Sequence, residues 1–309
     1  MSETSQVGGK EIRPLKYFDP RTLAKLQGLQ LRARHIVEGY VAGQHRSPMQ
    51  GFSIEFAEHR TYSPGDELRH VDWKVFGRTD KYYVKRYVDE TNLVCYLAVD
   101  VSESMSYRGD DALLTKLDYA KCVAAAIGWI VLKQLDAVAM VLFDEAVREF
   151  VRPGNNASQW SQLLQLLDAG TAGGKTATGP VFHELAERFP RRGVVVLISD
   201  FFDDPKSIVA GLRHFRHRQH DVVVMHIMDP TELDFPFEQA TCFRGLEHQP
   251  DVVTEPHKLR IAYLEEVDNF TRQLRWHCRD LGIDYLSVRT DQPIDQVLTS
   301  YFAQRRRRL

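Results

Sequence analysis

The chain has 309 residues, of which 43% are hydrophobic and 27% charged, and its formal net charge is −2. This composition is typical of a folded, soluble protein and gives no reason to expect binding to nucleic acid. The four cysteines are far apart and form no CxxC pair, and no apolar stretch is long enough to span a bilayer. We therefore expect a cytoplasmic protein with no membrane span.

The N-terminal part of the chain divides into two segments of different character. Residues 1–16 are polar and contain glycine, so we predict a flexible tail. Asp19 and Pro20 then suit the start of a helix, because aspartate caps helices and proline fits the first helical position. Residues 51–92 contain alternating segments such as YYVKRYVDE and the turn YSPGDE, a pattern typical of a β-hairpin. We predict that residues 17–91 form a helix and a small β-rich element.

From residue 93 onward, apolar runs alternate with segments of helical spacing. The clear runs are LVCYLAVD, AVAMVLFD, VVVLISD and DVVVMHIMD, with REFV and DYLSVR as weaker members. A long helix is predicted from Pro256 to Leu281, where Gly282 is placed to end it. Continuous apolar strands separated by helices indicate a mainly parallel sheet covered on both faces. We therefore predict a doubly wound α/β domain over residues 92–309.

Polar side chains follow two of these strands where the strands end. Asp100, Ser102 and Ser104 lie at alternate positions after the first run, and Asp200 ends VVVLISD. In an open α/β sheet, ligands bind beyond the carboxyl ends of the strands, where the strand order reverses. Carboxylate and hydroxyl oxygens suit Mg²⁺ or Mn²⁺ better than Zn²⁺. The alternative is that the serines cap the next helix and Asp100 only ends a strand.

This pattern resembles the metal-ion-dependent adhesion site of von Willebrand factor A (VWA) domains, in which three loops meet on one metal. The resemblance implies a VWA-like fold and a divalent cation held by residues of the segments DVSESM, GGKT and LISD: Asp100, Ser102, Ser104, Thr176 and Asp200. Family members usually have an aspartate after the threonine, whereas Ala177 stands here. Thr178 is therefore a competing candidate.

A second resemblance concerns the segment before the sheet. GFSIEFAEHRTYSPGDELRHVDWKVFGRTDKYYVKRYVDE, residues 51–90, resembles the signature of the bacterial domain of unknown function 58 family, which carries such an A domain after it. The resemblance implies a partner, a MoxR-type AAA+ ATPase or its client protein. It names no reaction.

Motifs for other chemistries fit less well. AGTAGGKT, residues 169–176, matches a relaxed P-loop, but it follows WSQLLQLLDAG, which has helical spacing, instead of a strand. HExxH and GxSxG do not occur, so neither a zincin nor an α/β-hydrolase is indicated.

Three functions remain after this reading. The first is a non-enzymatic interaction module whose bound cation binds a carboxylate of a partner protein. The second is a metal-dependent phosphohydrolase or nuclease that uses the same carboxylates to hold a water nucleophile. The third is a structural A-type domain that binds by shape without a metal. We favour the first, because the site segments supply no evident general base besides the metal ligands.

Overall fold

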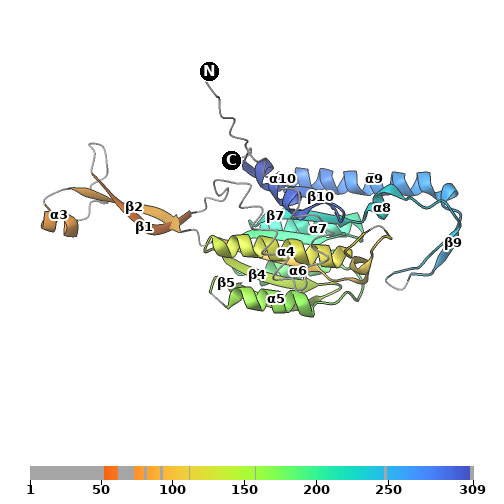
Figure 1. Ribbon diagram of the computed structural model, residues 1–309, viewed down its shortest axis with the longest axis horizontal. Coiled ribbons are helices and arrows are strands. Elements are labelled where there is room, and N and C mark those ends of the chain that lie inside the picture. The colour runs from red at the N-terminus through yellow and green to blue at the C-terminus, as the bar shows by residue number, and fades with distance from the viewer. Residues whose placement is uncertain are drawn as a thin grey trace, which may run out of the picture.

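The structure is a computed structural model and is shown in Figure 1. It describes residues 52–61, 73–79, 82–90, 93–110, 112–156, 158–246 and 249–306. The predicted tail, the helix predicted from Asp19 and the YSPGDE turn lie outside the described residues. The boundary at residue 92 stays a prediction.

The predicted apolar runs all form strands of one six-stranded sheet. These strands are β3 (Val94–Asp100), β4 (Ala137–Phe143), β5 (Val147–Gly154), β6 (Val194–Ser199), β7 (Asp221–Met228) and β10 (Asp284–Arg289). Their order is β10-β7-β6-β3-β4-β5, and only the pairing of β4 with the edge strand β5 is antiparallel. When the six strands are numbered in chain order and read from β5, this is the 3-2-1-4-5-6 order of doubly wound folds. The predicted fold class is therefore confirmed, and the edge strand β5 is the one departure from parallel pairing.

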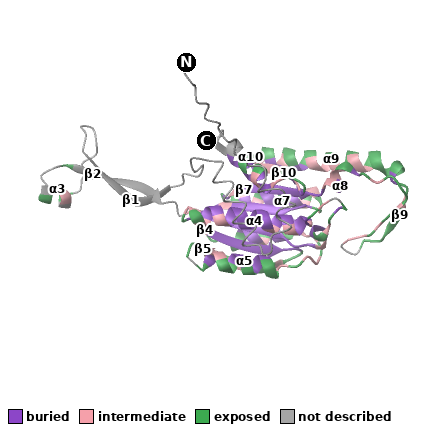
Figure 2. Cartoon of the chain, in the orientation of Figure 1, coloured by how far each residue is buried: buried purple, intermediate pink, exposed green. Residues whose placement is uncertain are grey.

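Helices cover both faces of this sheet. The helical elements are η3 (Glu103–Ser106), α4 (Lys116–Lys133), α5 (Gln159–Ala169), α6 (Thr178–Arg188), α7 (Pro205–His217), α8 (Pro230–Asp234), α9 (Pro256–Asp280) and α10 (Ile294–Arg306). One buried cluster joins the sheet to α4, α5 and α10, and a second joins it to α6, α7 and α9. Figure 2 shows the sheet buried between these layers.

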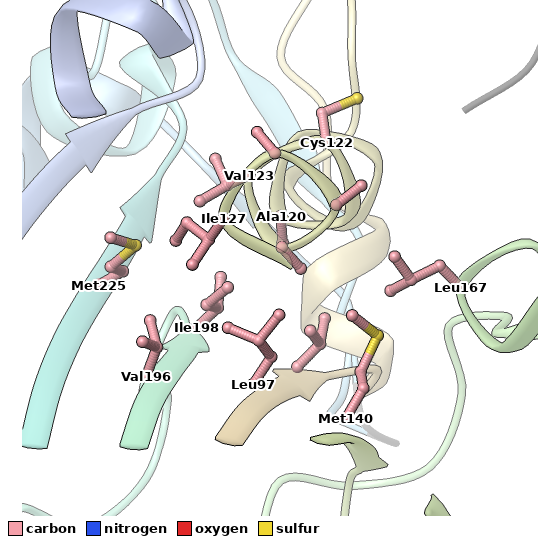
Figure 3. Packing of buried hydrophobic residues seen from close by; sticks show 14 of the residues in the cluster. Leu97, Ala120, Cys122, Val123, Ile127, Met140, Leu167, Val196, Ile198 and Met225 are labelled. Carbon is pink, nitrogen blue, oxygen red and sulfur yellow. The ribbon is translucent and has the colours of Figure 1, made fainter. Parts of the chain in front are cut away.

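Alternation along the strands divides the core between the two faces. In β3, Leu97 packs with the α4 side of the sheet, whereas Tyr96 packs with the α6 and α7 side. Successive side chains of a strand point to opposite faces, so a strand buried on both faces must be apolar throughout. Figure 3 shows Leu97 and Ile198 pointing from the sheet toward Ile127 of α4. The continuous apolar runs of the sequence reflect this two-sided burial.

Two glycines allow α6 and α7 to pack closely. A Cβ atom at Gly211 of α7 would lie 2.6 Å from Cβ of Phe182 on α6, and one at Gly179 would clash with Oγ of Ser207. Neither position has room for a side chain unless the helices separate. The start of α6 is thereby fixed against the start of α7, and both helix starts border the site described below.

Two smaller β elements accompany the domain. β1 (Phe52–Thr61) and β2 (Tyr83–Glu90) pair antiparallel, as the predicted hairpin requires, but the helix α3 (Trp73–Thr79) lies between them. The alternation of charged and apolar residues in this segment had indicated strand. β8 (Thr241–Phe243) and β9 (Val252–Thr254) form a two-stranded arm beside α8, visible in Figure 1. In the described parts of the chain, no helix has the length and apolar character needed to cross a membrane.

Candidate functional site

The predicted carboxylates lie at the centre of the sheet, where its winding reverses. β3 and β6 are neighbours at this position, Asp100 is the last residue of β3, and Asp200 directly follows β6. Both residues are buried, with 0% and 4% of their surface exposed. This is where doubly wound folds bind ligands.

The loop after β3 brings its polar groups together. The backbone N–H of Ser102 donates to Oδ1 of Asp100 at 2.8 Å, and the hydroxyl of Ser199 donates to Oδ2 at 2.5 Å. The hydroxyl oxygens of Ser102 and Ser104 are 3.0 Å apart, and Ser104 also hydrogen-bonds Asp200. Ser102 precedes η3, but its side chain makes no capping bond. Four of the five predicted residues therefore converge, and the capping alternative is not supported for Ser102.

A buried lysine that the sequence analysis did not select lies in the same cluster. Nζ of Lys116 is 2.7 Å from Oδ2 of Asp200 and 2.7 Å from Oε1 of Glu232. Lys116 is the first residue of α4, and Glu232 belongs to the capping box of α8, where it accepts the N–H of Asp229. The sequence contains one weak signal for Glu232, because its segment DPTE directly follows the end of β7.

The pKa values in the cluster follow from burial and from these neighbours. Burial and the nearby Asp200 raise the pKa of Asp100. Burial would also raise the pKa of Asp200, but the ammonium group of Lys116, together with hydrogen bonds from Ser104 and the Phe202 N–H, outweighs it and the pKa falls. Burial would lower the pKa of Lys116, yet its two carboxylate partners raise it. Lys116 and Asp200 are therefore a charged pair, and Asp100 is the carboxyl group of this pair of aspartates that takes up a proton more readily.

The threonine loop lies against the loop after β3. The N–H of Gly173 donates to the carbonyl of Val101 at 2.8 Å, and the N–H of Glu103 donates to the carbonyl of Gly174 at 3.0 Å. Thr176 follows two residues later and is half-buried. It stays the predicted ligand from this loop.

The competing candidate, Thr178, has another role. Its hydroxyl donates to Oδ2 of Asp203 at 2.7 Å, and its N–H donates to the same oxygen at 2.8 Å. Asp203 thus fixes the start of α6, while Asp204 caps α7 by accepting the N–H of Ser207 at 3.1 Å. These contacts explain both aspartates without placing them in the candidate metal site.

The donor set fits a hard divalent cation. Asp100, Asp200, Ser102 and Ser104 offer only oxygen, which Mg²⁺ and Mn²⁺ prefer. With all three carboxyl groups ionised, the single ammonium of Lys116 leaves two negative charges in the cluster, which one divalent cation would balance. Within the described residues, no group of three or more His, Cys, Asp and Glu side chains is placed to hold a metal. Hydroxyl groups would therefore have to complete the coordination of a metal at this position.

Comparison with known proteins places the chain in a family. The model of the family described as "Protein of unknown function DUF58" matches residues 58–271. The chain belongs to this family. Its sheet has the doubly wound strand order, with the antiparallel edge strand β5, and the DxSxS segment follows the inner strand β3.

Matches to relatives cover most of the length of this DUF58 protein. It is 26% identical over 299 residues to "Uncharacterized protein Mb1516" of Mycobacterium bovis and to "Uncharacterized protein Rv1480" of Mycobacterium tuberculosis. Each match covers 94% of this chain and 91% of the relative.

Two solved structures resemble this DUF58 protein at low sequence identity. The conserved hypothetical protein BatB from Bacteroides thetaiotaomicron is 16% identical, with a TM-score of 0.47, and the match covers 70% of this chain and 100% of BatB. The SpRpn10 VWA domain is 10% identical, with a TM-score of 0.40, and the match covers 67% and 94%.

Proposed function

We propose that this DUF58 protein is a non-enzymatic interaction module that holds Mg²⁺ or Mn²⁺ at Asp100, Ser102, Ser104, Thr176 and Asp200. The cation would supply an open coordination position for a carboxylate oxygen of a partner protein. A VWA-like domain in a DUF58 protein suggests a protein-interaction role, and the metal dependence is our addition.

The convergence of two buried carboxylates and two hydroxyls at the centre of the sheet carries this proposal. Burying a carboxylate is costly unless it is paired. Asp200 has Lys116 as its partner, whereas the described hydrogen-bond donors to the carboxylate of Asp100 are neutral groups of Ser102 and Ser199. A site that holds a desolvated carboxylate in this way is arranged for a cation.

The neighbouring residues hold the donors in position. Ser199 and the Ser102 N–H orient the carboxylate of Asp100, and Lys116 fixes that of Asp200. The bonds from Gly173 and Glu103 hold the threonine loop beside them. None of these contacts requires a residue to act as a general base, so the proposed role is binding and not a reaction.

The partner is proposed to be a MoxR-type AAA+ ATPase or the client protein of that ATPase. This part rests on the family resemblance of residues 51–90. A purified MoxR-type ATPase should co-elute with this protein in size-exclusion chromatography when Mg²⁺ is present, and should separate from it in EDTA. Co-elution in both buffers would argue for metal-independent recognition.

Calorimetry tests the metal site directly. We expect saturable heats when the wild type is titrated with Mg²⁺ or Mn²⁺, and none for the Asp100→Ala and Asp200→Ala variants. Ca²⁺ serves as the comparison ion, because it prefers more ligands at longer distances.

Asp204→Ala is the matched control. Asp204 is four residues from Asp200 and is exposed, and its carboxylate caps α7. This variant should bind metal like the wild type while losing about 1 kcal/mol of stability. Equal, negligible heats for all proteins would contradict a metal site in the free protein.

A further inference from the structure

A cavity of about 410 Å³ lies directly beside the candidate metal centre. Lys116, Asp200 and Glu232 belong to its lining, so it shares the buried ion pairs described above. Tyr263, Val267 and Phe270, from one face of α9, also line it. The volume is within the range of sites that bind small molecules or single side chains.

One polar atom in the lining has no hydrogen bond of good geometry. His226 of β7 is fully buried, and its Nδ1 atom lies 2.7 Å from the hydroxyl of Tyr285. Its Nε2 atom has no hydrogen-bond partner of good geometry, although the main chain of Asp200 lies nearby. Buried polar atoms are nearly always hydrogen-bonded, so an unpartnered nitrogen in a cavity wall points to a ligand. Of the two tautomers of His226, the one whose Nδ1–H donates to the Tyr285 oxygen leaves Nε2 as an acceptor, and a guanidinium would select this tautomer.

The charges of the lining select the ligand further. Asp203 and Glu266 add two carboxylates to those of Asp200 and Glu232, and Lys116 is the sole cation among the described lining residues. The charge of Lys116 is already matched by its two partners. The cavity therefore favours a cation over an anion, and its aromatic walls favour one with a flat, weakly hydrated face.

We propose that this cavity binds the guanidinium group of an arginine side chain that a partner protein presents beside the metal centre. The guanidinium has several N–H donors for Nε2 of His226 and for the carboxylate of Glu266, and its plane can stack on Phe270. A neutral apolar side chain would leave Nε2 unpaired. An ammonium group is more strongly hydrated and is therefore harder to bring into an apolar cavity. The proposal rests on the proposed role in protein interaction and adds the chemistry of the partner.

Capped amino acids test this assignment. The full chain, in EDTA, is titrated with N-acetyl-arginine methylamide and with the norleucine and lysine equivalents, and dissociation constants are measured by ligand-observed NMR. We expect the arginine probe to bind about tenfold more tightly than the norleucine probe, because its hydrogen bonds are charge-assisted. The lysine probe should fall between them. Equal affinity of arginine with either of the other probes would overturn the proposal.

Two pairs of variants place the probe in the cavity. Glu266→Gln changes an exposed lining residue and should weaken arginine binding about threefold. Its control is Glu265→Gln, at the exposed neighbouring position. Val267→Trp should fill the cavity and abolish binding, whereas Ile261→Trp, at a position 71% exposed on the same helix, should not.

The outcome is separable from that of the metal site. Because EDTA is present throughout, absence of a metal site would leave the arginine titration unchanged. Wild-type affinity in both Glu266→Gln and Val267→Trp would overturn the proposal even if the arginine probe binds. Thermal melts of all four variants confirm that each one is folded.

Discussion

Lys116 and Asp200 form an ion pair with 2.7 Å between Nζ and Oδ2, in which the side chains are only 3% and 2% exposed. The pair joins the start of α4 to the end of β6 across 84 residues of sequence. The pair also explains how the two carboxylates of Asp100 and Asp200 can be buried side by side at the carboxyl ends of β3 and β6. Lys116 keeps Asp200 charged by lowering its pKa. A second buried negative charge nearby is unfavourable, so the pKa of Asp100 is raised.

Replacing Lys116 by methionine should destabilise the protein strongly. The substitution keeps the length of the side chain but leaves Asp200 and Glu232 buried without their cation. We expect the free energy of unfolding in urea to fall by about 3–5 kcal/mol. Lys133→Met, at the exposed end of the same helix, is the control and should cost less than about 1 kcal/mol. A loss below that value for Lys116→Met would mean that the pair is well solvated in solution.

Asp100 should make the stability of the metal-free protein depend on pH. Burial and Asp200 raise its folded pKa from 3.8 to about 7. Its contribution is therefore fully present below the unfolded pKa and is lost as the pH rises through the folded value. In EDTA, the wild type should lose stability between about pH 4 and pH 8 relative to Asp100→Asn. Urea unfolding of both proteins across this range tests this, and parallel curves would contradict it.

The two threonines of the loop before α6 should separate by function. Thr178→Ala removes the hydroxyl that donates to Asp203 and should cost about 1 kcal/mol of stability while leaving Mg²⁺ affinity unchanged. Thr176→Ala should lower Mg²⁺ affinity at little cost in stability. Calorimetry and urea unfolding on both variants give the comparison. Loss of Mg²⁺ binding in Thr178→Ala alone would reverse the assignment.

The core should respond according to burial, independently of any ligand. Leu97 is fully buried between the sheet and α4, and Leu97→Ala should lower the free energy of unfolding by about 3–5 kcal/mol. Leu259→Ala, at a position 42% exposed on α9, should lower it by less than about 1 kcal/mol. Similar losses in urea unfolding would mean that α9 packs more tightly at its start than the structure shows.

The sheet was predictable because burial on both faces leaves a clear signal. A strand such as β3 must be apolar at every position, and Asp100 marks the point where that requirement ends. The sequence alone could then predict that the side chains after β3 and β6 lie together at the carboxyl ends of these parallel strands. The helix α9 was predictable from its spacing and from Gly282, whose φ of +64° suits glycine.

The remaining features depend on distances that spacing does not encode. Lys116 begins a helix, where a lysine is usually solvated, and only tertiary packing brings it to Asp200 and Glu232. The unpartnered nitrogen of His226 could not be inferred either, because a histidine in an apolar strand is usually satisfied by neighbours. α3 was missed for a local reason, since charged and apolar residues alternate there at a spacing that also suits a strand.

The close contact of α6 and α7 limits how far the loops of the candidate site can move. Thr178 starts α6, and Asp203 lies just before α7, so the glycines that hold these helices together also hold the two loops. Packed helices cannot separate without opening voids, so the threonine and aspartate loops should move as one rigid body. If the proposed partner binds here, little ordering of the two loops would be required, because they would already be in position.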